Sequence, residues 1–160
     1  MKTLKWIFLA VLVFLLQTQS FFIKDFFNLS VVLVYYFGLK SYRRNADYDY
    51  SGSKAGIESV VFGVIIGLTE DVISGSIIGP GLLSKGLLGL MTPIVFTDMV
   101  FKWTPLWGAI IVVIFSLLDG MVVIGSRILF TGIHVTGAAL FQIICVQSLM
   151  SMPFGMLLRP

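Results

Sequence analysis

The strongest constraint on this chain is its succession of long apolar runs, which are separated by short polar stretches. Of its 160 residues, 58% are hydrophobic and only 12% are charged. Average soluble domains carry about 25% charged residues, so this chain has too few polar side chains to cover a water-facing globule. We therefore exclude a soluble enzyme and a disordered chain, and we expect an integral membrane protein.

Six apolar segments are predicted to be membrane-spanning helices. A transmembrane helix needs roughly 20 residues, so a chain of this length holds six spans with short connections and no separate soluble domain. We expect an all-α membrane protein in which residues 1–160 form one compact transmembrane bundle. Residues 125–134 fit neither a loop nor a helix clearly. The predicted spans are residues 6–23, 26–39, 57–75, 82–101, 106–124 and 135–158.

The positive charges predict how the bundle is oriented. Eight of the 11 lysines and arginines fall at the termini and the even-numbered junctions, whereas Lys24, Lys85 and Arg127 fall on the other side. Because cytoplasmic loops carry an excess of positive charge, we expect both termini and the polar loop 40–56 to be cytoplasmic. The net charge is +3, and the positively charged residues lie in short loops beside apolar runs. We therefore expect a lipid bilayer around the chain and no nucleic-acid partner.

Small residues recur at spacing four in the third and fourth predicted spans, together with charged residues. The third span carries such a ridge from Ser59 to Gly75, and the fourth carries one from Gly81 to Thr97. Residues four apart share one helix face, and small residues there let two helices approach closely. The ridges therefore predict close packing between these spans, with Asp71 and Lys85 facing the protein interior. The residues predicted to pack are Ser59, Gly63, Gly67, Gly75 and Gly89.

Four charged residues are expected in the outer half of the bundle: Asp71, Lys85, Asp119 and Arg127. Charged groups inside spans are costly and usually face the protein interior. We expect Asp71 and Lys85 to lie at similar depth and to form a buried ion pair or hydrogen-bond network. A ligand or ion site, or a contact with a partner's transmembrane helix, remains an alternative.

The loop 40–56 carries a second candidate site, formed by Arg43, Arg44 and Lys54. These residues either orient and solvate the loop or form a docking patch for a cytoplasmic partner or anionic lipid.

Catalytic and cofactor-binding patterns find no support in the sequence. Glu70 and Asp71 are adjacent, so on a helix they point about 100° apart and cannot act as an acid–base pair. His134 has no second metal ligand at useful spacing, and the single cysteine, Cys145, excludes an internal disulfide. We find no nucleotide-binding or metalloprotease motif. We therefore expect a non-enzymatic protein with no cofactor and no metal.

The order of these segments, together with residues 62–91, resembles the rod shape-determining protein MreD family of bacteria. Members share a glycine-rich third span of the form G-x-x-x-G-L-x-x-D followed by a small-residue turn. Here Gly63, Gly67, Leu68 and Asp71 stand at the motif positions, and Ser74, Gly75 and Gly79 stand in the turn. Gln17 and Gln19 near the end of the first span also match the family.

This resemblance implies a scaffold of the cell-elongation machinery in the bacterial inner membrane. Its expected partners are MreC and, with it, RodA and its penicillin-binding transpeptidase, which build peptidoglycan; the link to MreB filaments is indirect. The family is also similar in fold to the S components of energy-coupling-factor vitamin transporters. In an S component, the four outer-half charged residues would line a small-molecule pocket, so this function is the alternative expectation.

Overall fold

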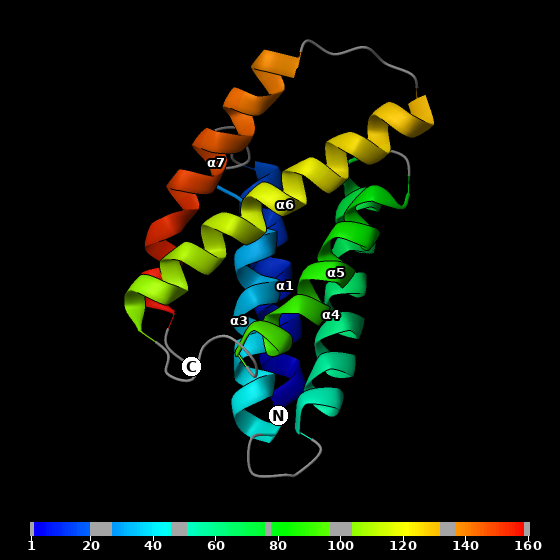
Figure 1. Cartoon of the computed structure of the whole chain (residues 1–160). Coiled ribbons are helices and arrows are strands. Elements are labelled where there is room, and N and C mark those ends of the chain that lie inside the picture. The colour runs from blue at the N-terminus through cyan, green and yellow to red at the C-terminus, as the bar shows by residue number, and fades with distance from the viewer. Residues whose placement is uncertain are drawn as a thin grey trace.

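The computed structural model describes residues 2–19, 27–45, 51–75, 78–96, 104–131 and 137–158, and these residues form six α-helices (Figure 1). The all-helical fold class predicted from the sequence is confirmed for this part of the chain. Successive helices alternate in direction, so the first helix begins and the last helix ends toward the same end of the molecule (Figure 1). The helices are α1 (Lys2–Gln19), α3 (Leu29–Asn45), α4 (Ser51–Ile73), α5 (Pro80–Ile94), α6 (Pro105–Thr131) and α7 (Gly137–Leu157).

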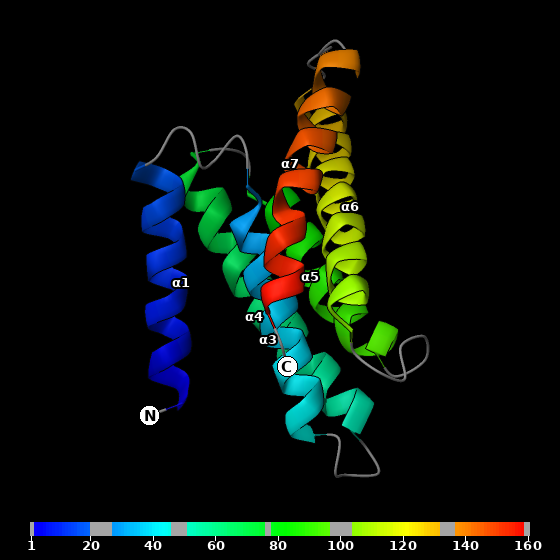
Figure 2. The same cartoon turned by 90° about the vertical axis from the view of Figure 1, so that its left-hand side faces the viewer.

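The helices are arranged around α3, which contacts all five of the others. The pair α4 and α5 forms one tightly packed hairpin, and α6 and α7 form a second. Helix α1 stands at the edge, where it packs against α3 (Figure 2).

The central position of α3 explains why its sequence reads as a continuous apolar run. A helix that is hydrophobic all round is a buried helix, and each residue from Val31 to Tyr35 is at most 6% exposed. The Tyr35 ring packs against the rings of Phe96 and Phe115. These contacts join α3 to α6 and to the end of α5.

Three predicted boundaries are corrected by the structure. Helix α3 continues to Asn45 and α4 begins at Ser51, so the prediction of a loop over residues 40–56 is wrong at both ends. Hydropathy shows where the apolar part of a sequence ends. It does not show where the helix ends, because a helix can continue through polar residues. Helix α6 runs to Thr131, which makes residues 125–131 helical. Residues 20–26, 97–103 and 132–136, which include parts of the predicted spans, lie outside the described residues.

The outer surface of the bundle is apolar. Along α4, the residues Ile57, Val61, Ile65, Leu68 and Val72 are all exposed, and they follow the three-to-four spacing of a single helix face. Exposed leucines and isoleucines also line α5 and α6.

Among the described residues, only α6 contains an apolar segment long enough by itself to cross a membrane, Pro105–Phe130. The apolar segments Lys5–Leu15 and Gln142–Leu157 are shorter. Helices α3 and α5 have only 17 and 15 residues. Helix α4 is continuous, but Glu58, Glu70 and Asp71 interrupt its apolar sequence.

Candidate functional site

The close approach of α4 and α5 depends on three of the predicted packing glycines. A Cβ atom on Gly63 would lie 2.8 Å from the carbonyl carbon of Lys85, and one on Gly89 would lie 2.8 Å from that of Ser59. A Cβ on Gly67 would lie 2.7 Å from the Cα of Leu82. Real Cβ atoms essentially never lie within 3.0 Å of such atoms. The two backbones are therefore in contact along the ridges.

Gly75 has a different role from the one predicted. Its φ angle is +61°, and a Cβ there would meet no atom of the described residues within 4 Å. The prediction that Gly75 packs against another helix is therefore wrong. The spacing of four continues past the end of α4 at Ile73, and Gly75 supplies the left-handed conformation that commonly ends a helix.

Asp71 binds the first turn of α5. Its Oδ2 accepts a hydrogen bond from the backbone N–H of Gly79 (2.8 Å), and its Oδ1 accepts one from that of Gly81 (3.0 Å). The N–H of Leu82 also donates to Oδ2 (3.2 Å). The first N–H groups of a helix have no partner within the helix, and the helix dipole favours a negative charge there. The Asp71 carboxylate, which is only 4% exposed, thus fixes the end of α5 against α4.

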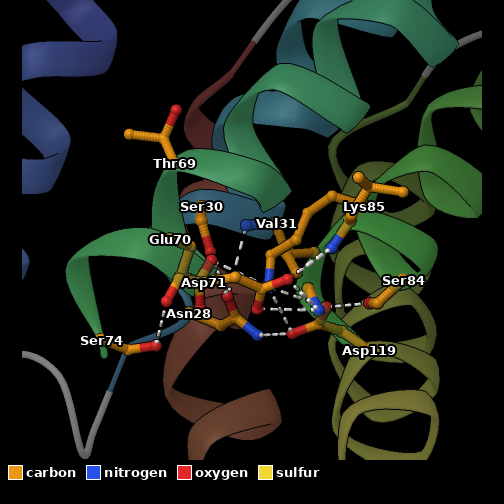
Figure 3. Close-up of polar contacts among 12 residues, drawn as sticks. Asn28, Ser30, Val31, Thr69, Glu70, Asp71, Ser74, Ser84, Lys85 and Asp119 are labelled. Atoms are coloured by element: carbon orange, nitrogen blue, oxygen red, sulfur yellow. Dashed lines mark hydrogen bonds and ion pairs between the residues drawn. The ribbon is translucent and has the colours of Figure 1, made fainter. Parts of the chain in front are cut away.

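Lys85 and Asp119 form the centre of a second buried group, in which Glu70 is the other carboxylate (Figure 3). The Lys85 Nζ lies 3.0 Å from Asp119 Oδ1 and 2.9 Å from Glu70 Oε2. Lys85 is fully buried and Asp119 is 5% exposed, whereas Glu70 lies at the edge. A buried charge is tolerated when it is paired and hydrogen-bonded. These ion pairs connect α5 to both α4 and α6.

Two uncharged side chains complete the bonding of Asp119. Asn28 Nδ2 donates to Asp119 Oδ2 (2.7 Å), and the Ser84 hydroxyl donates to Oδ1. Asn28 directly precedes α3, and its Oδ1 accepts from the N–H of Val31 (3.3 Å), so Asn28 also caps that helix. We call this group the polar core: Asn28, Glu70, Ser84, Lys85 and Asp119.

The expected ion pair between Asp71 and Lys85 is not the arrangement found. Both side chains are buried, but Asp71 binds the backbone of α5 and Lys85 binds Glu70 and Asp119. Each side chain instead belongs to a buried hydrogen-bond network, which was the other arrangement expected, and backbone N–H groups at the start of α5 bind the Asp71 carboxylate. Arg127 lies on α6, and its side chain is outside the described part of the structure.

Three members of the polar core were not assigned a role from the sequence. Glu70 was considered only as a partner of Asp71, and its position about 100° around the helix is what lets it reach Lys85. Ser84 gave no signal, because serine is common on small-residue faces. Asn28 did give one, since an asparagine before an apolar run is a typical helix N-cap.

The candidates predicted in the loop 40–56 lie on helix ends rather than in a loop. Arg43 and Arg44 belong to the last turn of α3, and Lys54 lies in the first turn of α4. Arg44 pairs with Glu58, whose Oε2 also accepts from the Ser41 hydroxyl at 2.5 Å. These contacts join the ends of α3 and α4.

The geometry of the polar core suits holding helices together. Its donors and acceptors come from α4, α5, α6 and the start of α3. Each hydrogen bond or ion pair therefore fixes the position of one helix relative to another. Within the described residues, no three histidine, cysteine or carboxylate side chains converge as a metal site requires. His134 lies outside these residues, and Cys145 is a half-buried residue of α7.

Comparison with known proteins gave no match to any family model, curated protein or solved structure.

Proposed function

We propose that this chain is a six-span bundle in the bacterial inner membrane and a non-enzymatic scaffold of the cell-elongation machinery. The distribution of its side chains supports the membrane placement, since three charged side chains are buried and many large apolar side chains are exposed. Lys85 is 0% exposed and Asp119 5%, whereas Ile57 on the surface of α4 is 64% exposed. A soluble bundle would have the reverse distribution.

The lengths of the helices are compatible with this placement. Helices α3 and α5 have 17 and 15 residues, which corresponds to about 26 and 23 Å at roughly 1.5 Å per residue. Both are shorter than a hydrocarbon core of about 30 Å, and short spans are accommodated by local thinning of the bilayer. Helix α3 also packs inside the bundle, where neighbouring helices cover it.

The polar core favours a scaffold over a substrate-binding S component, and this is the observation that carries the functional choice. An S component would direct its outer-half charged groups into a pocket. Here Lys85 and Asp119 are directed at each other, and Asp71 is directed at the backbone of α5. Two grooves in the described part of the molecule are lined by other residues, on α1, α3 and α7 and at the adjoining Phe27 and Leu158.

The choice of machinery depends on the resemblance of residues 62–91 to the MreD family. Under this proposal MreC is the direct partner, and RodA with its transpeptidase assembles through it, while MreB is linked indirectly. The α4–α5 hairpin would present a fixed surface to a partner, because its register is set by backbone contact, by the buried Asp71 carboxylate and by the ion pair of Glu70 with Lys85.

The test is affinity purification of the tagged full chain from its native membrane in mild detergent, followed by mass spectrometry of proteins and small molecules. We expect MreC, RodA and the transpeptidase to be recovered. An unrelated tagged membrane protein from the same cells is the control. Recovery of ATPase subunits together with a bound vitamin would refute the scaffold and establish the S-component function.

A further inference from the structure

A groove made of two adjoining hollows lies between α1 and the rest of the bundle. Its apolar part encloses about 390 Å³ and is lined by α1, α3 and α7, with Leu12, Val32 and Phe154 among its walls. Its second part encloses about 480 Å³ toward the N-terminal end of α1. Leu9 and Tyr36 line both parts, so the two volumes adjoin.

The second part of the groove is cationic and aromatic. Lys5, Lys40 and Arg44 line it. The Lys40 Nζ lies 5.8 Å from the centre of the Trp6 ring and 5.6 Å from that of Tyr36, within cation–π range. Arg44 pairs with Glu58, but no carboxylate of the described residues pairs with Lys5 or Lys40.

The charges lie at the end of the molecule that the proposed topology places in the cytoplasm. Lys5 is near the start of α1, and Lys40 and Arg44 are near the end of α3. In an inner membrane, this end meets the headgroups of the cytoplasmic leaflet, and the apolar part of the groove lies at the depth of the acyl chains. The groove therefore matches an amphipathic molecule whose charged end is negative.

We propose that this groove binds one anionic phospholipid of the cytoplasmic leaflet, with its phosphate beside Lys5 and Lys40 and an acyl chain between α1 and α3. Volumes of this size are typical of small-molecule pockets, which span about 300–1,000 Å³, and a helix about 10 Å wide would need more room. The proposal rests on the membrane placement above and is independent of the scaffold function and its partners.

The experiment measures lipid binding to the delipidated full chain by native mass spectrometry. Phosphatidylglycerol is the anionic probe and phosphatidylcholine the zwitterionic one. We expect one phosphatidylglycerol to bind and phosphatidylcholine to bind at least tenfold more weakly. In the Lys5→Gln/Lys40→Gln variant, phosphatidylglycerol affinity should fall about 30-fold, since each lysine near an anionic lipid contributes roughly fivefold.

A charge-matched control separates this site from general surface attraction. The Arg43→Gln/Lys54→Gln variant removes two exposed cations from the same end of the molecule, outside the groove lining. We expect its affinity to stay within twofold of the unmodified chain. An equal loss in both double variants would overturn the proposal.

Two further variants keep the result independent of folding, and two further measurements identify the occupant. The Lys5→Arg/Lys40→Arg variant keeps both charges and should keep the lipid; loss of binding there would overturn the charge argument. Leu12→Trp fills the apolar part and should weaken binding while the cations remain. Competition by inorganic phosphate, or capture of a protein segment instead of lipid by a photo-crosslinker at Leu12, would also overturn it.

Discussion

The close contact between α4 and α5 predicts that adding one methyl group at Gly63 destabilises the whole bundle. A Cβ there would lie 2.8 Å from the carbonyl carbon of Lys85, whereas ordinary van der Waals contact begins at 3.4 Å. The helices must therefore separate by at least about 0.6 Å, and the carbonyl oxygen of Lys85 lies closer still. Neither atom can move alone, because both belong to helix backbones.

The expected cost follows from this separation. A gap of about 0.5–1 Å forfeits a quarter to a half of the dispersion energy of each contact, and the contacts at Gly67 and Gly89 lie along the same ridge. Overpacking in a well-packed core costs about 1–3 kcal/mol. Since the obstacle is backbone, we expect Gly63→Ala to lie near the upper end of this range.

Gly56 provides a matched control on the same helix. A Cβ there would lie 3.9 Å from Leu90 Cδ1, which is ordinary contact. Both substitutions gain the same helix propensity, about 1 kcal/mol, so the difference between Gly63→Ala and Gly56→Ala isolates the clash. We would measure the free energy of unfolding by titration with sodium dodecyl sulfate in mixed micelles, with tryptophan fluorescence as the signal. Equal stability of the two variants would refute the backbone contact.

Three further predictions test the polar core and the membrane placement. Asp119→Ala leaves Lys85 buried with one carboxylate and should reduce the free energy of unfolding by about 3–5 kcal/mol, whereas the double replacement Lys85→Met/Asp119→Leu should cost much less; equal costs in the same titration would contradict the pairing. Asp71→Ala removes the acceptor for the first turn of α5 and should reduce the free energy of unfolding by about 1–2 kcal/mol. It should also lower the recovery of the proposed partner MreC in the affinity purification. Normal stability with normal cell shape would count against this prediction. In a chain with its native cysteine replaced, Val61→Cys should resist a water-soluble maleimide in intact membranes while Lys54→Cys reacts; rapid labelling of both would exclude a membrane-embedded α4.

The ridges could be predicted because helix geometry relates spacing to position directly. Gly63 and Gly67 stand four apart, and the structure places both against the backbone of α5. The same rule failed at Gly75, because a spacing pattern does not show where the helix ends. A glycine after the last turn has a conformational role that its spacing cannot distinguish from packing.

The pairing of charges could not be predicted, because it depends on competition among groups from several helices. Asp71 and Lys85 were expected to meet because they lie at similar depth. Instead, the free N–H groups at the start of α5 bind the Asp71 carboxylate, and the carboxylate of Asp119 on α6 binds Lys85. The relative positions of three helices decide between these partners. The spacing of residues within one segment does not show how that segment lies relative to the others.

The polar core and the glycine ridges depend on each other, which explains why both occur in one hairpin. In a membrane, apolar surface alone gives little preference for one helix contact over another, so small residues and polar contacts select the packing. The ridges bring α4 within reach of Lys85, and the bonds of Lys85 to Glu70 and Asp119 then fix the register at which the ridges meet. Helix α1 packs through Trp6 against Tyr36 and Phe37, and the Lys40 Nζ of α3 lies over the Trp6 ring at cation–π distance. The buried polar contacts therefore join α3, α4, α5 and α6 to one another, whereas the groove beside α1 is lined by none of these polar side chains.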